Sequence, residues 1–307
     1  MTDLRFIASN TPLAKSNNRK IKNDFIKNKN KAMGIVIGID VGGSTTKIVG
    51  LENGNIISPM FITATDPVSS LFGAFGKYIY TNNISLSDIE HVMITGVGSA
   101  SVDGEIYGLP TTKADEFQSD GLGARFGSCL ENLIVVSMGT GTTLVKVEGD
   151  DIKHLGGISM GGGTLMGLCS LLLKTTKIDT IQELAERGNV KNVNLQIEDI
   201  CKKDIEGLPL YATASLFGKV SNAHVSEEDL AIGIYYLVIQ TIGSAAVLSA
   251  LNSGIRDFVA IGNLTKIPQC RTIFKMMESL YDVRFHIPEY AEFRTAIGAA
   301  LCYHKQA

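Results

Sequence analysis

Two turns rich in glycine and hydroxyl groups carry the residue types that hold phosphate. The first runs from Asp40 through Gly42, Gly43, Ser44 and Thr45 to Lys47, directly after an apolar segment. Its glycines let backbone N–H groups approach phosphate oxygens, and Lys47 can balance their charge. Asp40 is suited to hold Mg²⁺ through water, because Mg²⁺ keeps much of its hydration shell. We predict a phosphate site here, with an ordinary hairpin as the alternative.

A second turn of this kind, Gly139-Thr140-Gly141-Thr142-Thr143, follows the apolar run 133–137. In both places we expect a strand, the turn and a returning strand, which indicates an internal duplication. Such a pair predicts two similar α/β lobes with a nucleotide held between them. Neither turn is a Walker A loop or a GxGxxG motif, so the P-loop and Rossmann folds lose their usual support.

A third glycine-rich segment, 156–164, contains Gly161-Gly162-Gly163-Thr164 and leads into an expected helix at 165–173. The positive end of a helix dipole suits an anion or a ribose phosphate. A flexible hinge is the alternative, and both can hold, since lobes of this type close on their substrate.

The adjacent acids Asp115 and Glu116 are candidates for a general base. Neighbouring side chains usually point apart, so we expect one acid to be catalytic and the other to cap a helix or to be solvated. On spacing alone, a pair of helix N-terminal acids is the simpler interpretation. The five histidines show no metal-ligand spacing and no Ser/His/Asp arrangement.

Apolar runs and turn residues predict the elements that position these groups. We expect strands at 34–40, 47–50, 56–63, 90–95, 133–137, 144–147 and 257–261, and helices at 66–81, 165–173, 227–251 and 293–302. The chain has 307 residues and is 45% hydrophobic, enough for two lobes. We place an N-terminal α/β lobe at 33–130 and a C-terminal α/β lobe at 131–307.

Charge separates the first residues from the rest. Residues 1–32 hold eight Lys/Arg and two Asp/Glu, so they carry about +6 while the remainder carries about −9 of the net −3. We interpret 1–32 as a disordered basic leader rather than a nucleic-acid-binding or membrane-binding arm. No signal-peptide pattern and no uninterrupted apolar run of ~18–20 residues is present, so no membrane partner is expected. Five scattered cysteines without a CxxC pair indicate a reducing cytoplasm.

From about residue 34 to 300, an ordered set of strings resembles the type II (eukaryotic-type) pantothenate kinases. The strings are GIDVGGSTTK at 38–47, KADE at 113–116, GTGTTL at 139–144, GGISMGGGTLMGLCSLL at 156–172, EGLPLYATASLFG at 206–218, SEEDLA at 226–231, IGSAA at 242–246, VAIGN at 259–263 and FRTAIGAAL at 293–301. The specific ones are GGGT followed by GLCSLL, and GLP followed by the ATASLFG segment, because single motifs of the other kinds are shared with many sugar kinases. The resemblance implies the actin/hexokinase/Hsp70-like ATPase fold. That fold has two duplicated ribonuclease-H-like lobes with the nucleotide in the cleft between them.

The same resemblance implies an ATP- and Mg²⁺-dependent phosphorylation of pantothenate to 4'-phosphopantothenate, the first step of coenzyme A biosynthesis. Glu116 matches the general base, and Asp40 the position near Mg²⁺. Thr143 matches a hydroxyl near the substrate. The positions that match nucleotide contacts are Gly42, Gly43, Ser44, Thr45, Lys47, Thr140, Gly161, Gly162, Gly163, Thr164, Leu165 and Asn263.

The sequence departs from the family at one position. The family usually has an arginine that holds the pantothenate carboxylate, whereas here His154, preceded by Lys153, gives the best match. Arginine makes a permanent bidentate contact, but histidine is mostly neutral at pH 7. Either Lys153 substitutes, or carboxylate recognition is weaker, or the substrate is a neutral relative such as pantetheine.

The family also implies a homodimer and feedback by coenzyme A or its acyl forms. The small-residue patch 243–246 in the expected helix 227–251 is a candidate interface. Three rival hypotheses stay open: a sugar kinase of the same fold, a non-catalytic sensor of nucleotide or coenzyme A, and an ATPase activator of a radical enzyme. Scattered cysteines disfavour the last, because such activators bind a cluster between subunits.

Overall fold

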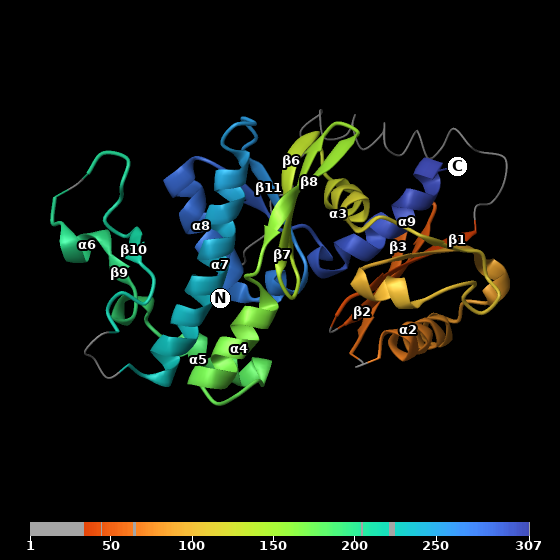
Figure 1. Cartoon of the computed structure of the whole chain (residues 1–307), viewed down its shortest axis with the longest axis horizontal. Helices are drawn as coiled ribbons and strands as arrows, with labels where there is room; N and C mark the ends of the chain where they lie inside the picture. The colour runs from red at the N-terminus through yellow and green to blue at the C-terminus, as the bar shows by residue number, and fades with distance from the viewer. Residues whose placement is uncertain (1–33, 44, 64–65, 204, 221–224, 307) are drawn as a thin grey trace, which may run out of the picture.

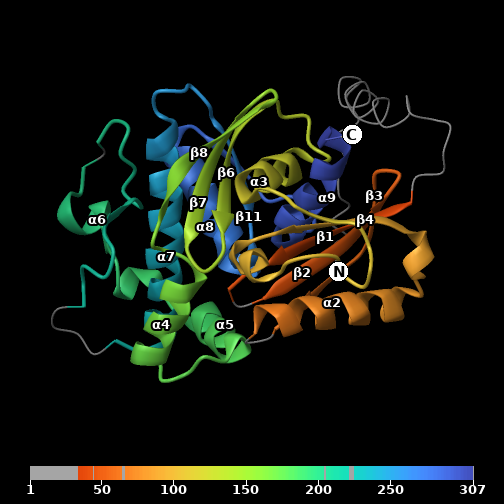
Figure 2. The same cartoon turned by 45° about the vertical axis from the view of Figure 1, so that its right-hand side comes forward.

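The computed structural model describes residues 34–43, 45–63, 66–203, 205–220 and 225–306. Within this part of the chain, two five-stranded sheets are separated by a pair of helices (Figures 1 and 2). The predicted leader, 1–32, and Ser44 lie outside the described residues.

The first sheet has the strand order β3-β2-β1-β4-β5. Strands β1 to β3 form an antiparallel meander, and β4 and β5 continue parallel to β1. All seven residues of β1 are buried, because α2 covers one face of the sheet and α9 the other. The bounds are β1 (Ile35–Val41), β2 (Thr46–Glu52), β3 (Asn55–Ile62), α2 (Pro67–Asn82), η1 (Leu86–Asp88), β4 (Ile89–Thr95), η2 (Val97–Ser101) and β5 (Thr111–Lys113).

The second sheet repeats this arrangement with the order β12-β11-β6-β7-β8. Strands β6 to β8 form the antiparallel meander, and β11 and β12 run parallel to β6. The bounds are β6 (Asn132–Met138), β7 (Thr142–Glu148), β8 (Asp151–Ile158), β11 (Asp257–Ile261) and β12 (Arg284–His286). The matching strand orders confirm the predicted duplication and the two-lobed α/β fold.

Helices α4, α5, α7 and α8 build the largest core on one face of the second sheet. Helix α2 begins with a capping aspartate and proline, and α8 also begins with proline. The remaining bounds are α4 (Gly162–Leu172), α5 (Ile178–Arg187), η3 (Val190–Asn192), β9 (Leu195–Gln196), α6 (Ile197–Ile200), β10 (Thr213–Ser215), α7 (Glu227–Ala250), η4 (Asn263–Lys266), α8 (Pro268–Tyr281) and η5 (Ala291–Phe293).

Helix α7 is long and apolar because it lies in the core of the second lobe. By length and composition it is the one described helix that could cross a membrane, but most of it is buried in the protein. Within the predicted interface patch, Gly243 and Ala246 are buried. A Cβ at Gly243 would lie 2.6 Å from the Met277 sulfur of α8. Half of that patch therefore packs inside the chain rather than facing a second copy.

Helices α3 (Glu116–Arg125) and α9 (Arg294–Gln306) pack against each other between the sheets (Figure 2). They approach so closely that a Cβ at Gly123 would collide with the Arg294 carbonyl oxygen, and one at Gly298 with the Ser119 carbonyl oxygen. Helix α3 lies on the second sheet, and α9 lies on β1, β2 and β4 of the first. A division at residue 130 is therefore not clean, because the last helix of the chain packs on the N-terminal sheet.

Candidate active site

A buried ion pair stands where the first glycine turn begins and ends. Asp40 and Lys47 face each other in the register of β1 and β2, with Lys47 Nζ 3.1 Å from Asp40 Oδ2. Each side chain is only 9% exposed. Between them, the Gly42 N–H donates to the Thr45 carbonyl oxygen at 3.0 Å and closes the turn. The charge of Lys47 is thus held next to Asp40, at the edge of the predicted phosphate loop.

Glu116 is the first residue of α3, and Asp115 is its N-cap. The Asp115 side chain accepts a hydrogen bond from the Gln118 N–H at 2.9 Å, so the prediction that one acid of the pair caps a helix is confirmed for Asp115. Glu116 is half-buried. Burial raises its pKa, and the charge of Asp40 raises it further, while Lys47 lowers it. Partial burial beside a second carboxylate is the environment that a general base near neutral pH needs.

Asp120 is a second acid of this site, and the sequence analysis missed it. It lies one helical turn after Glu116 on α3 and is 1% exposed. Its Oδ1 accepts a hydrogen bond from Thr295 Oγ1 at 2.6 Å, whereas Oδ2 has no partner. Burial raises the pKa of Asp120 to about 7, and the charges of Glu116 and Asp40 act in the same direction. The i, i+4 spacing from Glu116 was the available signal, because it puts two side chains on one helix face.

Thr95 and Gly96 close the site on the other side of Asp40. Thr95 pairs with Asp40 in the register of β4 and β1, and its buried Oγ1 has no hydrogen-bond partner. Gly96 has φ +86°, and a Cβ there would lie 2.6 Å from Asp40 Oδ1. A buried hydroxyl without a partner is satisfied when water occupies its neighbourhood. The residues around Asp40 therefore fit a hydrated cation.

The described residues contain no group of three or more His, Cys, Asp or Glu side chains that could hold a metal ion directly. The expectation that Asp40 reaches Mg²⁺ through water stays a prediction; Mg²⁺ is commonly bound by one or two carboxylates together with substrate phosphates.

The Gly161–Gly163 segment packs directly on the second glycine turn. The Gly162 N–H donates to the Gly139 carbonyl oxygen at 2.8 Å, and the Gly163 N–H donates to the Thr140 carbonyl oxygen at 2.9 Å. A Cβ at Gly161 would lie 2.5 Å from that Thr140 oxygen. Close approach of the two segments is therefore a structural reason for these glycines. Two N–H groups at the start of α4 already have partners, so the predicted nucleotide contacts of this segment stay predictions.

The neighbouring residues of this segment and of the first turn differ in accessibility. Leu165 is buried in the core of the second lobe, and the Thr164 hydroxyl donates to the Ser159 carbonyl oxygen at 3.1 Å. Gly43, in contrast, is exposed, and a Cβ there would meet no atom within 4 Å. Of the predicted phosphate-binding glycines, Gly43 is the one with open space beside it.

Two contacts join the two lobes, and the first of them is between residues predicted to bind the nucleotide. Asn263 Nδ2, at the start of η4, donates to Thr45 Oγ1 at 3.4 Å. Lys266 of η4 lies over the ring of Phe61 on β3, with Nζ 4.9 Å from the centroid. Thr143 pairs with Ser137, whose hydroxyl lowers the pKa of the Asp120 carboxyl. The fold thus assembles residues that are far apart in the sequence around one region.

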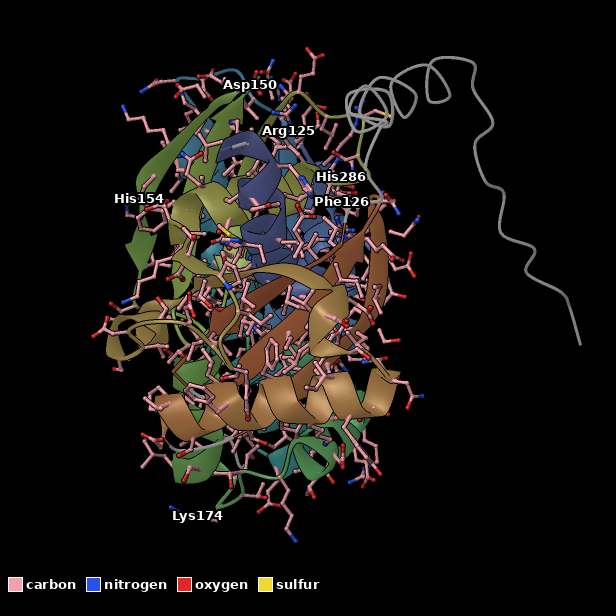
Figure 3. All side chains as sticks on the ribbon, turned by 90° about the vertical axis from the view of Figure 1, so that its right-hand side faces the viewer. Arg125, Phe126, Asp150, His154, Lys174 and His286 are labelled. Carbon is pink, nitrogen blue, oxygen red and sulfur yellow. The ribbon has the colours of Figure 1, made fainter. Side chains whose placement is uncertain are left out.

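The two candidates for carboxylate recognition, Lys153 and His154, lie next to each other on β8 and point to opposite faces of the sheet. The His154 ring stacks on the ring of Phe117, the residue after Glu116, with centroids 4.0 Å apart and an angle of 5°. Figure 3 shows His154 at the outer edge of the molecule. Lys153 precedes it on the strand and pairs with Lys146, so its side chain leaves the opposite face of the sheet. His154, not Lys153, is therefore the residue on the face of the sheet that α3 covers.

Solved structures share this fold at low sequence identity. The activator of the 2-hydroxyisocaproyl-CoA dehydratase from Clostridium difficile, with bound ADPNP, has a TM-score of 0.64 at 17% identity. The match covers 89% of this chain and 95% of that one. A ROK family glucokinase from Streptomyces griseus, in complex with glucose and AMPPNP, has a TM-score of 0.56 at 12% identity, with 88% and 99% covered. These likenesses confirm the predicted actin/hexokinase-like fold.

Sequence relatives point to one family. The type II pantothenate kinase of Staphylococcus haemolyticus is 26% identical over 86% of this chain and 98% of its own length. The Staphylococcus aureus enzyme of the same name is 27% identical, with 86% and 97% covered. A mouse 4'-phosphopantetheine phosphatase is 39% identical, but the match spans 40% of this chain and only 16% of the mouse protein.

The family model described as Fumble matches residues 132–300, more than half of the chain. This segment includes the second glycine turn, the Gly161–Gly163 segment and Asn263. Together with the type II pantothenate kinase relatives and the shared fold, the match confirms the resemblance that the motifs indicated. The chain belongs to the Fumble family and is a kinase of the actin/hexokinase-like superfamily.

Proposed function

We propose that the protein uses MgATP to phosphorylate the primary hydroxyl of pantothenate, giving 4'-phosphopantothenate for coenzyme A biosynthesis. The observation that carries this proposal is the half-buried Glu116 beside the Asp40–Lys47 pair, at the edge of the first glycine turn. The bacterial relatives named type II pantothenate kinase, which align with most of this chain, supply the substrate class.

In this proposal Glu116 accepts the proton of the substrate hydroxyl as its oxygen attacks the γ-phosphorus of ATP in line. The raised pKa of Glu116 makes the carboxylate a better proton acceptor at neutral pH. Most of the rate would come from positioning and from charge stabilisation. Lys47 and the exposed Gly43 backbone would hold the phosphates, and Asp40 would hold Mg²⁺ through water. The ion neutralises charge on the β- and γ-phosphates when it is bound.

A second candidate substrate, pantetheine, is favoured by the position of His154. A pantothenate carboxylate beside Phe117 would meet a ring that makes at most one hydrogen bond to it, and Lys153 points to the other face of the sheet. Pantetheine has no carboxylate, so the absence of an arginine at this position does not weaken its binding. The two substrates differ at the end remote from the phosphorylated hydroxyl, so the same base serves both.

We extend the proposal to the setting of the enzyme: a cytoplasmic homodimer that is inhibited by coenzyme A or an acyl form. Because Gly243 and Ala246 are buried, the dimer contact would have to use other residues. Large apolar side chains exposed near the ends of α4 and α7 are the best candidates: Leu171, Leu172, Leu248 and Leu251.

The activator hypothesis finds no support in the cysteines. Cys169, Cys270 and Cys302 are buried and all five cysteines are free. Within the described residues they do not gather into a metal-holding group. Iron-free, colourless purified protein is the expected result, whereas a bound iron–sulfur cluster would favour the activator.

A coupled ADP-release assay tests the proposed function. Purified protein with MgATP would be given pantothenate, pantetheine or N-acetylglucosamine side by side, and Glu116→Gln would serve as the matched variant. Pantothenate turnover that is lost in the variant supports the full proposal. Turnover of pantetheine alone moves the assignment to a salvage kinase. Turnover of the sugar alone indicates a sugar kinase. ATP binding without any turnover supports a non-catalytic sensor of nucleotide or coenzyme A.

A further inference from the structure

Asp120 is a buried carboxyl that the proposed reaction does not use. It is sealed at the meeting point of three elements: it belongs to α3, it accepts a hydrogen bond from Thr295 of α9, and Ser137 at the end of β6 lies beside it. Its side chain is cut off from solvent, and Oδ2 has no hydrogen-bond partner within normal distance, although the nearby Ser137 hydroxyl also favours the charged form. An acid with one unsatisfied oxygen in such a place is costly unless it is neutral, so it needs an explanation.

Asp120 and Glu116 are placed to feel each other's charge. They are four residues apart on α3, so their side chains project from the same face of the helix. Lys47, the cation of the site, is already paired with Asp40. Among the described residues no Lys, Arg or His forms an ion pair with Asp120. The charge of Asp120 is therefore uncompensated by a direct partner, and its field acts on Glu116 through a medium of low polarity.

The elements around Asp120 add few other charges. Asp115 lies on the same helix, and Asp40 and Lys47 come from the first sheet. On α9, Arg294 turns to the carbonyl oxygens of Gly123, Phe126 and Glu289, and Cys302 lies against the Ser119 hydroxyl. The acidic groups Glu116 and Asp40 are the charges that oppose ionisation of Asp120.

We propose that Asp120 is a positioning residue for the base: the charge on its sealed carboxyl sets how tightly Glu116 holds a proton. This inference rests on the phosphotransfer proposed above. While Asp120 is protonated, Glu116 is the weaker base. Once Asp120 ionises, its negative charge makes Glu116 hold a proton more strongly and therefore accept the substrate proton more readily. The two carboxyls titrate as a coupled pair rather than as independent groups.

A substitution of Thr295, which donates a hydrogen bond to Asp120, tests the pair without changing either carboxyl. Its hydroxyl donates to Asp120 and favours the charged form of the carboxyl. Thr295→Val removes the donor and retains the approximate shape of the side chain. It should move the ionisation of Asp120 to higher pH, whereas Asp120→Asn should abolish it. Both shifts follow for any buried carboxyl, so the discriminating readouts are the proton affinity of Glu116 and the rate–pH profile, which a role for Asp120 in packing alone would leave unchanged.

A carboxyl titration by NMR tests the coupling without relying on activity. Protein with ¹³C-labelled aspartate carboxyls is titrated, and the signal absent from Asp120→Asn is assigned to Asp120. In Glu116→Gln the midpoint of this signal should fall by about two pH units, from two unit charges ~6 Å apart at an effective dielectric constant of about 20. An identical midpoint in wild type and Glu116→Gln would overturn the inference.

The rate–pH profile tests its consequence for the reaction. In wild type, kcat/KM should rise between pH 6 and 8 with an inflection from Asp120. Asp120→Asn should lose this inflection, and Thr295→Val should shift it upwards. Equal loss of rate at every pH in both variants would refute the role. If wild type phosphorylates no pantoyl compound while the NMR coupling persists, the proposed function fails and the coupling of the two acids stands.

Discussion

Replacing Asp120 with asparagine should make the protein gain stability, relative to wild type, as the pH rises from about 4 to 7. Asparagine has nearly the same shape and its side-chain oxygen can still accept the hydrogen bond from Thr295. The substitution removes only the ionisable carboxyl group. The pKa of Asp120 is raised from 3.8 to about 7 by burial. The folded protein thus retains the proton across a range of pH in which the unfolded chain has lost it.

The sign follows from this difference. A pKa that is raised on folding gives stability that is fully present below the unfolded value and is lost as pH rises to the folded value. From 3.8 to about 7, at about 1.4 kcal/mol per pH unit, wild type should lose roughly 4 kcal/mol through this group. Asp120→Asn should lose none of it. Any pH-independent cost of burying the amide changes the unfolding free energy of the variant by the same amount at every pH.

Urea unfolding of both proteins at pH 4.5, 5.5, 6.5 and 7.5 measures this effect. Groups that are not coupled to Asp120 titrate in both proteins and largely cancel in the difference, whereas the pKa of Glu116 falls in the variant because the charge of Asp120 is gone. The difference in unfolding free energy should grow with pH and level off above about 7. A difference that stays constant from pH 4.5 to 7.5 would show that Asp120 has an ordinary pKa. That result would refute the argument from burial.

Four further substitutions test other parts of the structure. Gly298→Ala would drive a Cβ into a carbonyl oxygen of α3 and should lower the melting temperature markedly. Gly73→Ala on α2 is the control, because a Cβ there meets nothing within 4 Å, and it should stabilise the protein by about 0.5–1 kcal/mol. Equal effects of the two variants would contradict the close helix crossing. Lys47→Met leaves Asp40 buried without its partner and should cost about 3–5 kcal/mol in urea unfolding, and a loss below about 1 kcal/mol would mean that the pair is well solvated. His154→Arg should raise the kcat/KM ratio of pantothenate to pantetheine by about tenfold, because a guanidinium that can make two charged hydrogen bonds replaces a ring that makes at most one. An unchanged ratio would mean that His154 does not set substrate specificity.

The duplicated lobes could be predicted from the sequence because each begins with the same local pattern. An apolar strand, a glycine- and threonine-rich turn and a returning strand recur, and the structure pairs them in matching registers as β1–β2 and β6–β7. Strand pattern and turn chemistry are local properties, so a single sequence contains them. The helices predicted at 66–81 and 227–251 appear as α2 and α7 with nearly the same bounds.

What the sequence could not reveal depends on contacts between distant segments. Asp120 lies in a polar stretch of α3, and its burial comes from α9, some 170 residues later. The placement of α9 on the first sheet has the same origin, since nothing local tells a final helix to return to the N-terminal lobe. The glycines at 161–163 looked like phosphate ligands, yet their close contact with the turn at 139–141 is a sufficient structural reason for them.

The central claim is that this protein transfers phosphate from ATP to a pantoyl hydroxyl with Glu116 as the base. Mass spectrometry of a reaction with MgATP and equal amounts of pantothenate and pantetheine measures this transfer directly, with Glu116→Gln run in parallel. The proposal predicts a phosphorylated pantoyl product in wild type and a loss of at least about 100-fold in the variant. Product formed equally fast by Glu116→Gln, or none formed by folded, ATP-binding wild type, would contradict it.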